Sequence, residues 1–308
     1  MRGKDASLGV FMFHDFLKIQ IRFPLALPKE RGAMRASLFA VAVFLCATAM
    51  AQAQTIVHFP SQTPGWAMQL DAWLYQPKGN DKHPAVVFLH GCSGLLTSKH
   101  QPVARELSWA RYLNERGYVV LMIDSFGPRA VTNMCSTRQI ESVYMARPYD
   151  AGAGFAYLQA QPFVDANRIA VMGWSEGGGT VLYTVGSNAV QKNPGFRVAV
   201  AFYPGSCNIA RLGKEWTTSV PLLVLIGRAD IWTRADWCEH ALKHAQPQAQ
   251  LVIYPGAYHD FDWPNNPVKR LPQYPTAAGV IPIAGENPAA HADALRRVAE
   301  FLQEKLGN

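Results

Sequence analysis

The chain of 308 residues is 49% hydrophobic and 17% charged, a composition typical of a globular protein with a large core, which excludes an intrinsically disordered chain. Its formal net charge is +7, but much of the excess lies in the first 53 positions, and residues 54–308 carry only about +3. No basic run or stacking stripe of aromatic residues is present, so nothing indicates nucleic-acid binding.

The N-terminal segment is interpreted as a targeting signal. From Met34 the sequence reads MRASLFAVAVFLCATAMAQAQ, in which one Arg precedes a short apolar run and the small-x-small tripeptide AQA. The run is too short for a membrane span of ~20 residues. We therefore expect residues 34–53 to be a cleaved signal peptide, the protein to be periplasmic or secreted, and no stable membrane insertion afterwards. Residues 1–33 are interpreted as an over-extended start, although translation from Met1 would favour an uncleaved anchor.

The remainder, 54–308, is predicted to be one domain. Two segments alternate like strands of a partly exposed antiparallel edge, TIVHF (55–59) and MQLDAWLY (68–75). Six continuous apolar runs follow, as expected for strands covered on both faces: AVVFLH (85–90), YVVLMID (118–124), RIAVMG (168–173), RVAVAFY (197–203), PLLVLIG (221–227) and QLVIY (250–254).

Helix-like segments lie between these runs, near 101–116, 148–161, 176–190, 233–245 and 290–305. In the last of them, Ala294, Val298, Phe301, Leu302 and Leu306 recur with the period of a helix packed on a sheet. The alternation of strand and helix predicts an α/β fold, with a mostly parallel, doubly wound sheet and helices on both faces. Functional residues are then expected beyond the carboxyl ends of the strands.

The stretch MGWSEGGG (172–179) lies between an apolar run and a helix-like segment, which is the context of a nucleophile elbow. Its glycines permit a tight turn that would project the Ser175 hydroxyl above the sheet. The alternative interpretation is a plain glycine-rich turn.

A serine nucleophile needs a base and an orienting acid, and two candidates follow later strands. Asp230 follows LLVLIG, and His259 follows LVIY, in the chain order Ser, Asp, His. Asp230 could instead cap a helix, and His259 could be a surface histidine. Weaker candidates are Asp260 and Asp262 as the acid and His90, His240 and His244 as the base.

Two backbone N–H groups are predicted to form the oxyanion hole. One belongs to Glu176, at the start of the helix, and the other to Cys92 in the loop FLHGCSGL, with Ser93 as its alternative. A simple turn remains the other interpretation of this loop. Trp174 and Tyr258, with Phe261, Trp232 and Trp263, are near the triad in sequence and could line a pocket, although such aromatic residues more commonly pack in a core.

The motifs RIAVMGWSEGG, LIGRAD and YPGAYHDF resemble the dienelactone hydrolase family over about residues 67–306. The resemblance implies an α/β-hydrolase fold of about eight strands without a large cap, no cofactor, and hydrolysis of esters or lactones. The best-known members have cysteine at the position of Ser175 and glutamate at that of Gly91, which puts dienelactone itself in doubt as the substrate. Arg129 matches a family position that binds substrate carboxylate, or it is a solvated loop arginine.

Four cysteines follow the predicted leader, and none lies in a CxxC pair, so no metal site is expected. With the strand order of the family, the predicted disulfides are Cys92 with Cys135 and Cys207 with Cys238. The other connectivities, and a free Cys92, stay open.

The sequence therefore predicts an exported, monomeric serine hydrolase that cleaves small-molecule esters or lactones through an acyl-enzyme. Two alternatives are a peptidase of the prolyl-oligopeptidase type and a noncatalytic periplasmic binding protein on a hydrolase fold.

Overall fold

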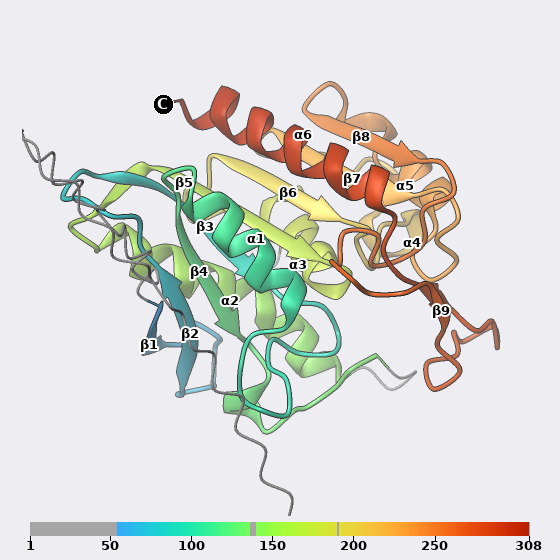
Figure 1. Ribbon diagram of the computed structural model, residues 1–308, viewed down its shortest axis with the longest axis horizontal. Coiled ribbons are helices and arrows are strands. Elements are labelled where there is room, and N and C mark those ends of the chain that lie inside the picture. The colour runs from blue at the N-terminus through green and yellow to red at the C-terminus, as the bar shows by residue number, and fades with distance from the viewer. Residues whose placement is uncertain (1–53, 136–139, 190, 308) are drawn as a thin grey trace, which may run out of the picture. The chain divides into compact units, whose positions relative to one another are not determined.

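The computed structural model describes residues 54–135, 140–189 and 191–307, so the predicted signal peptide and start segment lie outside the described residues. Its main feature is an eight-stranded sheet in the order β1-β2-β4-β3-β5-β6-β7-β8 (Figure 1). The strands are β1 (Gln54–Pro60), β2 (Gln69–Tyr75), β3 (His83–Leu89), β4 (Val119–Asp124), β5 (Val164–Trp174), β6 (Val198–Phe202), β7 (Leu222–Gly227) and β8 (Ala249–Tyr254).

The sheet is antiparallel at one edge and parallel elsewhere. Strand β2 pairs antiparallel with both β1 and β4, whereas every neighbouring pair from β4 to β8 is parallel. Strands β4, β6 and β7 are buried along their whole length, while most of β1 is exposed. These burial patterns confirm the predicted open edge and the covered central strands. For β8 the prediction of a strand covered on both faces was wrong, because β8 is the other edge of the sheet and is only partly buried.

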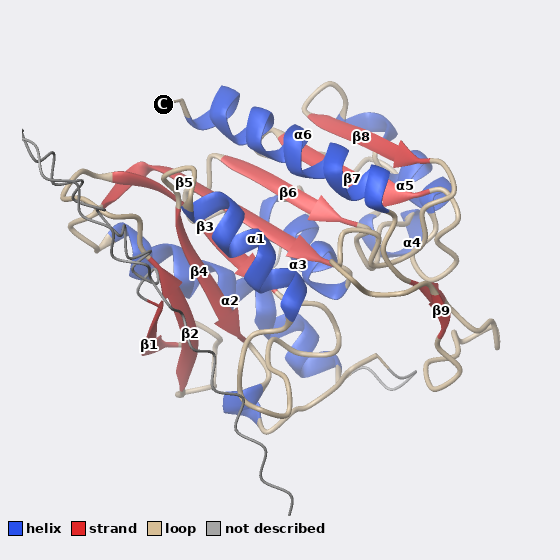
Figure 2. Ribbon diagram, in the orientation of Figure 1, coloured by secondary structure: helices blue, strands red, loops and turns tan. Residues whose placement is uncertain are grey.

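Helices cover both faces of the sheet, with α1 and α6 on one side and α2 and α3 on the other (Figure 2). The helices are α1 (Ala104–Asn114), α2 (Glu141–Gln159), α3 (Glu176–Val185), α4 (Ile209–Leu212), α5 (Ala235–Ala241) and α6 (Pro288–Leu306), with 3-10 turns η1 (Gly127–Arg129) and η2 (Lys243–Ala245). The predicted apolar face of α6 is buried as expected. Among the described helices, none is long and apolar enough to cross a membrane.

The sequence prediction was wrong at several boundaries. Helix α2 begins at Glu141 rather than near 148. Pro148, where the predicted helix began, lies inside the observed helix, although a proline usually marks the end of a helix. Helix α3 ends at Val185, before Gly186, rather than near 190. A small second sheet of β9 (Lys269–Arg270) and β10 (Ile283–Ala284) was not predicted, since two-residue strands carry no periodic signal.

Candidate active site

Ser175 occupies a strained turn between β5 and α3. Its backbone has φ 53° and ψ −115°, a left-handed φ that costs a non-glycine residue energy and is maintained by the surrounding structure. A Cβ at Gly177 would collide with the carbonyl oxygens of Leu89 and His90, and one at Gly173 would collide with the backbone of Gly177. The glycines thus allow the turn to pack directly against the end of β3.

The loops after β7 and β8 bring Asp230 and His259 to this turn. His259 Nε2 lies 2.9 Å from Ser175 Oγ, and His259 Nδ1 lies 2.7 Å from Asp230 Oδ2. Because a carboxylate only accepts hydrogen bonds, Nδ1 carries the proton and Nε2 accepts from the serine hydroxyl. All three residues are buried. His259 therefore contacts both of the other predicted triad residues.

Asp230 is held in place by its own loop. Its Oδ1 accepts the N–H groups of Trp232 at 2.8 Å and Thr233 at 2.9 Å, and its Oδ2 accepts the Thr233 hydroxyl at 2.7 Å. The capping role considered as an alternative thus coexists with the contact to His259. The imidazole itself lies between two rings, Tyr203 at 4.4 Å and Trp232 at 4.9 Å between centroids.

Electrostatics place the His259 pKa above the usual value for histidine. Burial by itself would lower this pKa, but the negative charge of Asp230 and the hydrogen bond from Nδ1 outweigh it and raise the pKa. A histidine poised in this way can take a proton from Ser175 and remain stable as the imidazolium.

The weaker candidates are engaged elsewhere. Asp260 accepts a hydrogen bond from Arg105 at 2.7 Å, and the buried Asp262 accepts from Trp109, Trp174 and Tyr203. Two of the alternative bases, His240 and His244, are exposed on α5 and η2. The third, His90, is buried, and burial together with Arg147 holds its pKa well below the usual value.

The two predicted oxyanion donors flank Ser175. Cys92 and Glu176 both line the pocket that contains Ser175, whereas Ser93 is exposed outside it. Within the described part of the chain, the N–H groups of Cys92 and Glu176 donate to no other group.

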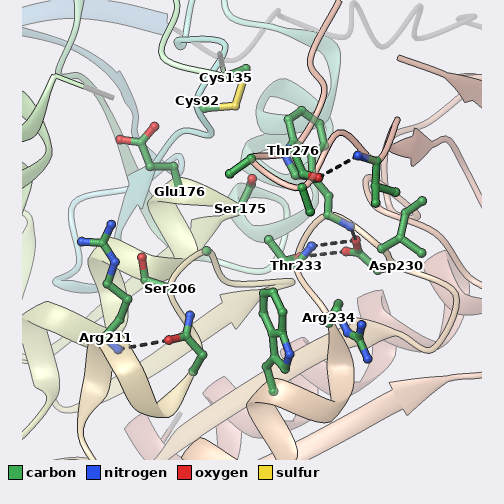
Figure 3. A pocket seen from close by; sticks show the side chains of 18 of the residues that line it. Cys92, Cys135, Ser175, Glu176, Ser206, Arg211, Asp230, Thr233, Arg234 and Thr276 are labelled. Atoms are coloured by element: carbon green, nitrogen blue, oxygen red, sulfur yellow. Dashed lines mark hydrogen bonds between the residues drawn. A yellow bond between two sulfur atoms is a disulfide. The ribbon is translucent and has the colours of Figure 1, made fainter. Parts of the chain in front are cut away.

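A cavity of about 1120 Å³ opens over Ser175 (Figure 3). Its apolar wall comprises Ile231, Trp232, Trp237 and Val280. Three arginines also line it, and two are neutralised, since Arg228 pairs with Glu239 and Arg234 with Asp236. The third, Arg211, is an exposed residue, and among the described residues its guanidinium forms no ion pair or hydrogen bond.

The predicted substrate-binding residues do not line this cavity. The side chain of Arg129 is 2% exposed, and both of its terminal nitrogens bond to Asp150 at 2.8 Å, so its guanidinium is already engaged. Trp174 is fully buried and donates to Asp262. Tyr258 is half-buried outside the lining. The structure therefore does not bring these three residues to the pocket. Arg211 on α4 and Trp237 on α5 line it instead. Sequence reasoning missed them, because α4 was not predicted and no motif marks Trp237 on the predicted helix of α5.

The structure contains both predicted disulfides, Cys92–Cys135 and Cys207–Cys238. Disulfides of this kind are typical of proteins in oxidising compartments. The first one forms part of the pocket wall, above Ser175 in Figure 3. It also links the loop of Cys92 to the segment of Met134, whose N–H donates to the Cys92 carbonyl at 2.8 Å.

The Cys92–Cys135 disulfide is expected to matter for turnover as well as stability. The two disulfides span 43 and 31 residues, so loop entropy gives each about 4 kcal/mol of stability. The double variant C92S/C135S should also lower kcat, because the loop that carries the Cys92 N–H loses its covalent link to the segment of Met134. The stability-matched control C207S/C238S should keep kcat. Urea unfolding and steady-state kinetics of both variants test this, and an equal kcat in the two would contradict it.

The fold is that of the α/β-hydrolases. Similar solved structures include a dienelactone hydrolase-like promiscuous phosphotriesterase from metagenomic libraries, at 18% identity and TM-score 0.61, covering 83% of this chain and 100% of the other. Porphyromonas gingivalis dipeptidyl peptidase 4 aligns at 19% identity and TM-score 0.57, over 83% of this chain but only 36% of that protein.

The model of the dienelactone hydrolase family matches residues 70–306, and the chain belongs to this family. A Bradyrhizobium sp. protein named "Probable 2-oxo-3-(5-oxofuran-2-ylidene)propanoate lactonase" is 25% identical over 201 residues, which cover 62% of this chain and 78% of that protein. The chain is accordingly a carboxylic ester hydrolase of small esters or lactones.

Proposed function

We propose that this hydrolase is an exported serine esterase or lactonase that works through an acyl-enzyme. The observation that carries the proposal is the continuous contact from Ser175 Oγ through His259 to Asp230. A fluorophosphonate probe, which reacts with activated serine hydroxyls, tests it directly. Within this proposal, residues 34–53 form the signal peptide, and the two disulfides support an oxidising destination such as the periplasm.

In the acylation step, Ser175 Oγ attacks the ester carbonyl carbon while its proton moves to His259 Nε2. The carbonyl oxygen becomes negative and accepts hydrogen bonds from the Cys92 and Glu176 N–H groups. The C–O bond to the alcohol then breaks, and His259 returns its proton to the departing oxygen. In a lactone that alcohol stays attached to the acyl group. Asp230 stabilises the imidazolium throughout.

In the deacylation step, His259 takes a proton from water, and the resulting hydroxide attacks the acyl carbon. The same two N–H groups stabilise the second oxyanion, and Ser175 leaves with the proton from His259. The products are the free acid and the restored hydroxyl, so no cofactor is needed for the proposed chemistry.

We further propose that the substrate carries a carboxylate that Arg211 binds. A guanidinium without a protein partner in the pocket favours an anion, and the Bradyrhizobium relative is named for a lactone that bears a propanoate. Replacing Arg211 by Ala should lower kcat/KM for a carboxylate-bearing aryl ester by about tenfold or more, because a charge-assisted hydrogen bond is lost. The value for p-nitrophenyl acetate should stay within about twofold.

The matched control is Arg228→Ala, because Arg228 lines the same pocket but is neutralised by Glu239. It should leave the preference between the charged and the neutral ester unchanged. A parallel loss on both esters in Arg211→Ala would show that Arg211 does not recognise the carboxylate.

A further inference from the structure

One buried arginine touches both sides of the proposed oxyanion hole without lining the pocket. Arg147, on α2, is 0% exposed, and its Nη2 donates to the His90 carbonyl at 2.5 Å. Its Nη1 lies 3.1 Å from Glu176 Oε1, and the two side chains form a buried ion pair. His90 is two residues before Cys92, and Glu176 is itself the second proposed donor.

The contact at His90 fixes the backbone that leads to Cys92. Two successive carbonyl oxygens in this loop accept hydrogen bonds. The His90 carbonyl accepts from Arg147. The Gly91 carbonyl accepts from His90 Nδ1 at 2.7 Å and from the Gly94 N–H at 3.2 Å. The peptide unit is planar and trans, so the Cys92 N–H points opposite to the Gly91 carbonyl. Anchoring these oxygens therefore sets the direction of the Cys92 N–H.

The protonation of His90 agrees with this arrangement. Its Nε2 accepts the Ser125 N–H at 3.2 Å, so the proton is on Nδ1, which donates to the Gly91 carbonyl. Arg147 lies 5.3 Å from the centre of the Phe126 ring, which also packs edge-on against His90. The guanidinium thus lies near a neutral imidazole and an aromatic ring, and its charge acts on the carboxylates of Glu176, Asp150 and Asp124.

The contact at Glu176 fixes the other donor. The start of α3 is pressed against the end of β3, since a Cβ at Gly177 would strike the Leu89 and His90 carbonyl oxygens. Arg147 bridges the same junction from α2, with one nitrogen on each element. A buried ion pair contributes little net stability compared with well-packed apolar residues. Positioning of the two backbone segments therefore explains the contacts of Arg147 better than stabilisation of the fold does.

We propose that Arg147 is a positioning residue that holds the Cys92 and Glu176 N–H groups at the spacing that a tetrahedral oxyanion requires. This inference rests on the proposed function. The inference adds to the proposed function a residue that acts through the backbone of the two oxyanion donors. This residue lies on α2, which contributes none of the proposed triad or oxyanion donors. Because the oxyanion exists only after the attack of Ser175, loss of Arg147 lowers kcat and leaves KM nearly unchanged.

The test compares Arg147→Met and Arg147→Lys with the wild type on a p-nitrophenyl ester. The Met variant should lose about 10- to 100-fold in kcat, less than the loss from deleting an oxyanion donor outright, with KM within about threefold. The Lys variant, which can still donate to the His90 carbonyl, should recover part of kcat. The acid midpoint of the pH profile should not move, since the contacts of His259 and Asp230 are untouched.

Two further variants separate positioning from folding. Val298→Ala truncates a buried side chain on α6 and serves as a stability-matched control that keeps kcat. The double variant R147M/E176L removes both buried charges, so it avoids the cost of leaving Glu176 unpaired and should fold, yet still lose kcat. An unchanged kcat in either Arg147→Met or R147M/E176L, or a loss confined to KM, would overturn the proposal.

Failure of this inference is distinguishable from failure of the proposed function. If Ser175→Ala abolishes turnover while the Arg147 variants keep it, only the role of Arg147 is wrong. If Ser175→Ala keeps full turnover, the proposed function fails and no role in an oxyanion hole can stand.

Discussion

Replacing Ser175 by Ala is expected to lower kcat for ester hydrolysis by four or more orders of magnitude, on the order of 10⁴ to 10⁶. The alanine variant has no oxygen to form the acyl-enzyme, while the pocket and the two backbone donors remain. The small hydrolysis left would come from water attacking a bound, polarised ester. Stopped assays on p-nitrophenyl esters measure the loss, and fluorophosphonate labelling followed by peptide mass spectrometry locates the modified residue.

Ser206 provides the matched control, because it lines the same pocket and its hydroxyl bonds to Tyr144 at 2.7 Å. Ser206→Ala should still be labelled at Ser175. Equal labelling of the wild type and Ser175→Ala, or no labelling of either, would contradict the mechanism in which Ser175 is the nucleophile and would favour the noncatalytic alternative. Aminoacyl anilides in the same assay test the peptidase alternative, which predicts that they are cleaved at a measurable rate, whereas the esterase should leave them intact.

The second large effect concerns Asp230, whose charge raises the His259 pKa. His259 acts as a base only when neutral, so kcat/KM of the wild type should fall as the pH drops through a midpoint above the usual histidine value. Asp230→Asn removes the interaction that raises this pKa and leaves the burial that lowers it. The midpoint should therefore move to lower pH, and the limiting rate should fall by about 10³- to 10⁴-fold, because the asparagine no longer fixes the correct tautomer.

Asp236→Asn is the control for removal of a carboxylate near the pocket, since Asp236 lines it but pairs with Arg234 in solvent. Its acid midpoint should match that of the wild type. Profiles of kcat/KM from pH 4 to 9 on a neutral ester provide the comparison. A midpoint for Asp230→Asn that is equal to or above that of the wild type would show that Asp230 does not control His259.

The sequence was most informative about the residues that directly follow the strands. Ser175, Asp230 and His259 are predicted to meet because each follows an apolar strand, and parallel strands bring their carboxyl ends to one edge of a sheet. The two disulfides followed from the strand order that the family resemblance implied. The start of α2 was missed because Pro148 looks like a boundary in sequence, although the helix continues through it.

Apolar strands and turn glycines leave local signals, so the order of residues along the chain was enough to predict the sheet, the family and the residues that meet at Ser175. The purpose of each arginine, in contrast, follows from contacts that exist only in the folded chain. Arg129 pairs with Asp150, and Arg147 bonds to Glu176 and to the His90 carbonyl. Of these three arginines, only Arg211 faces the cavity. These partners lie 21 to 57 residues apart along the chain, and the contacts of a long charged side chain depend on which surfaces packing brings within its reach.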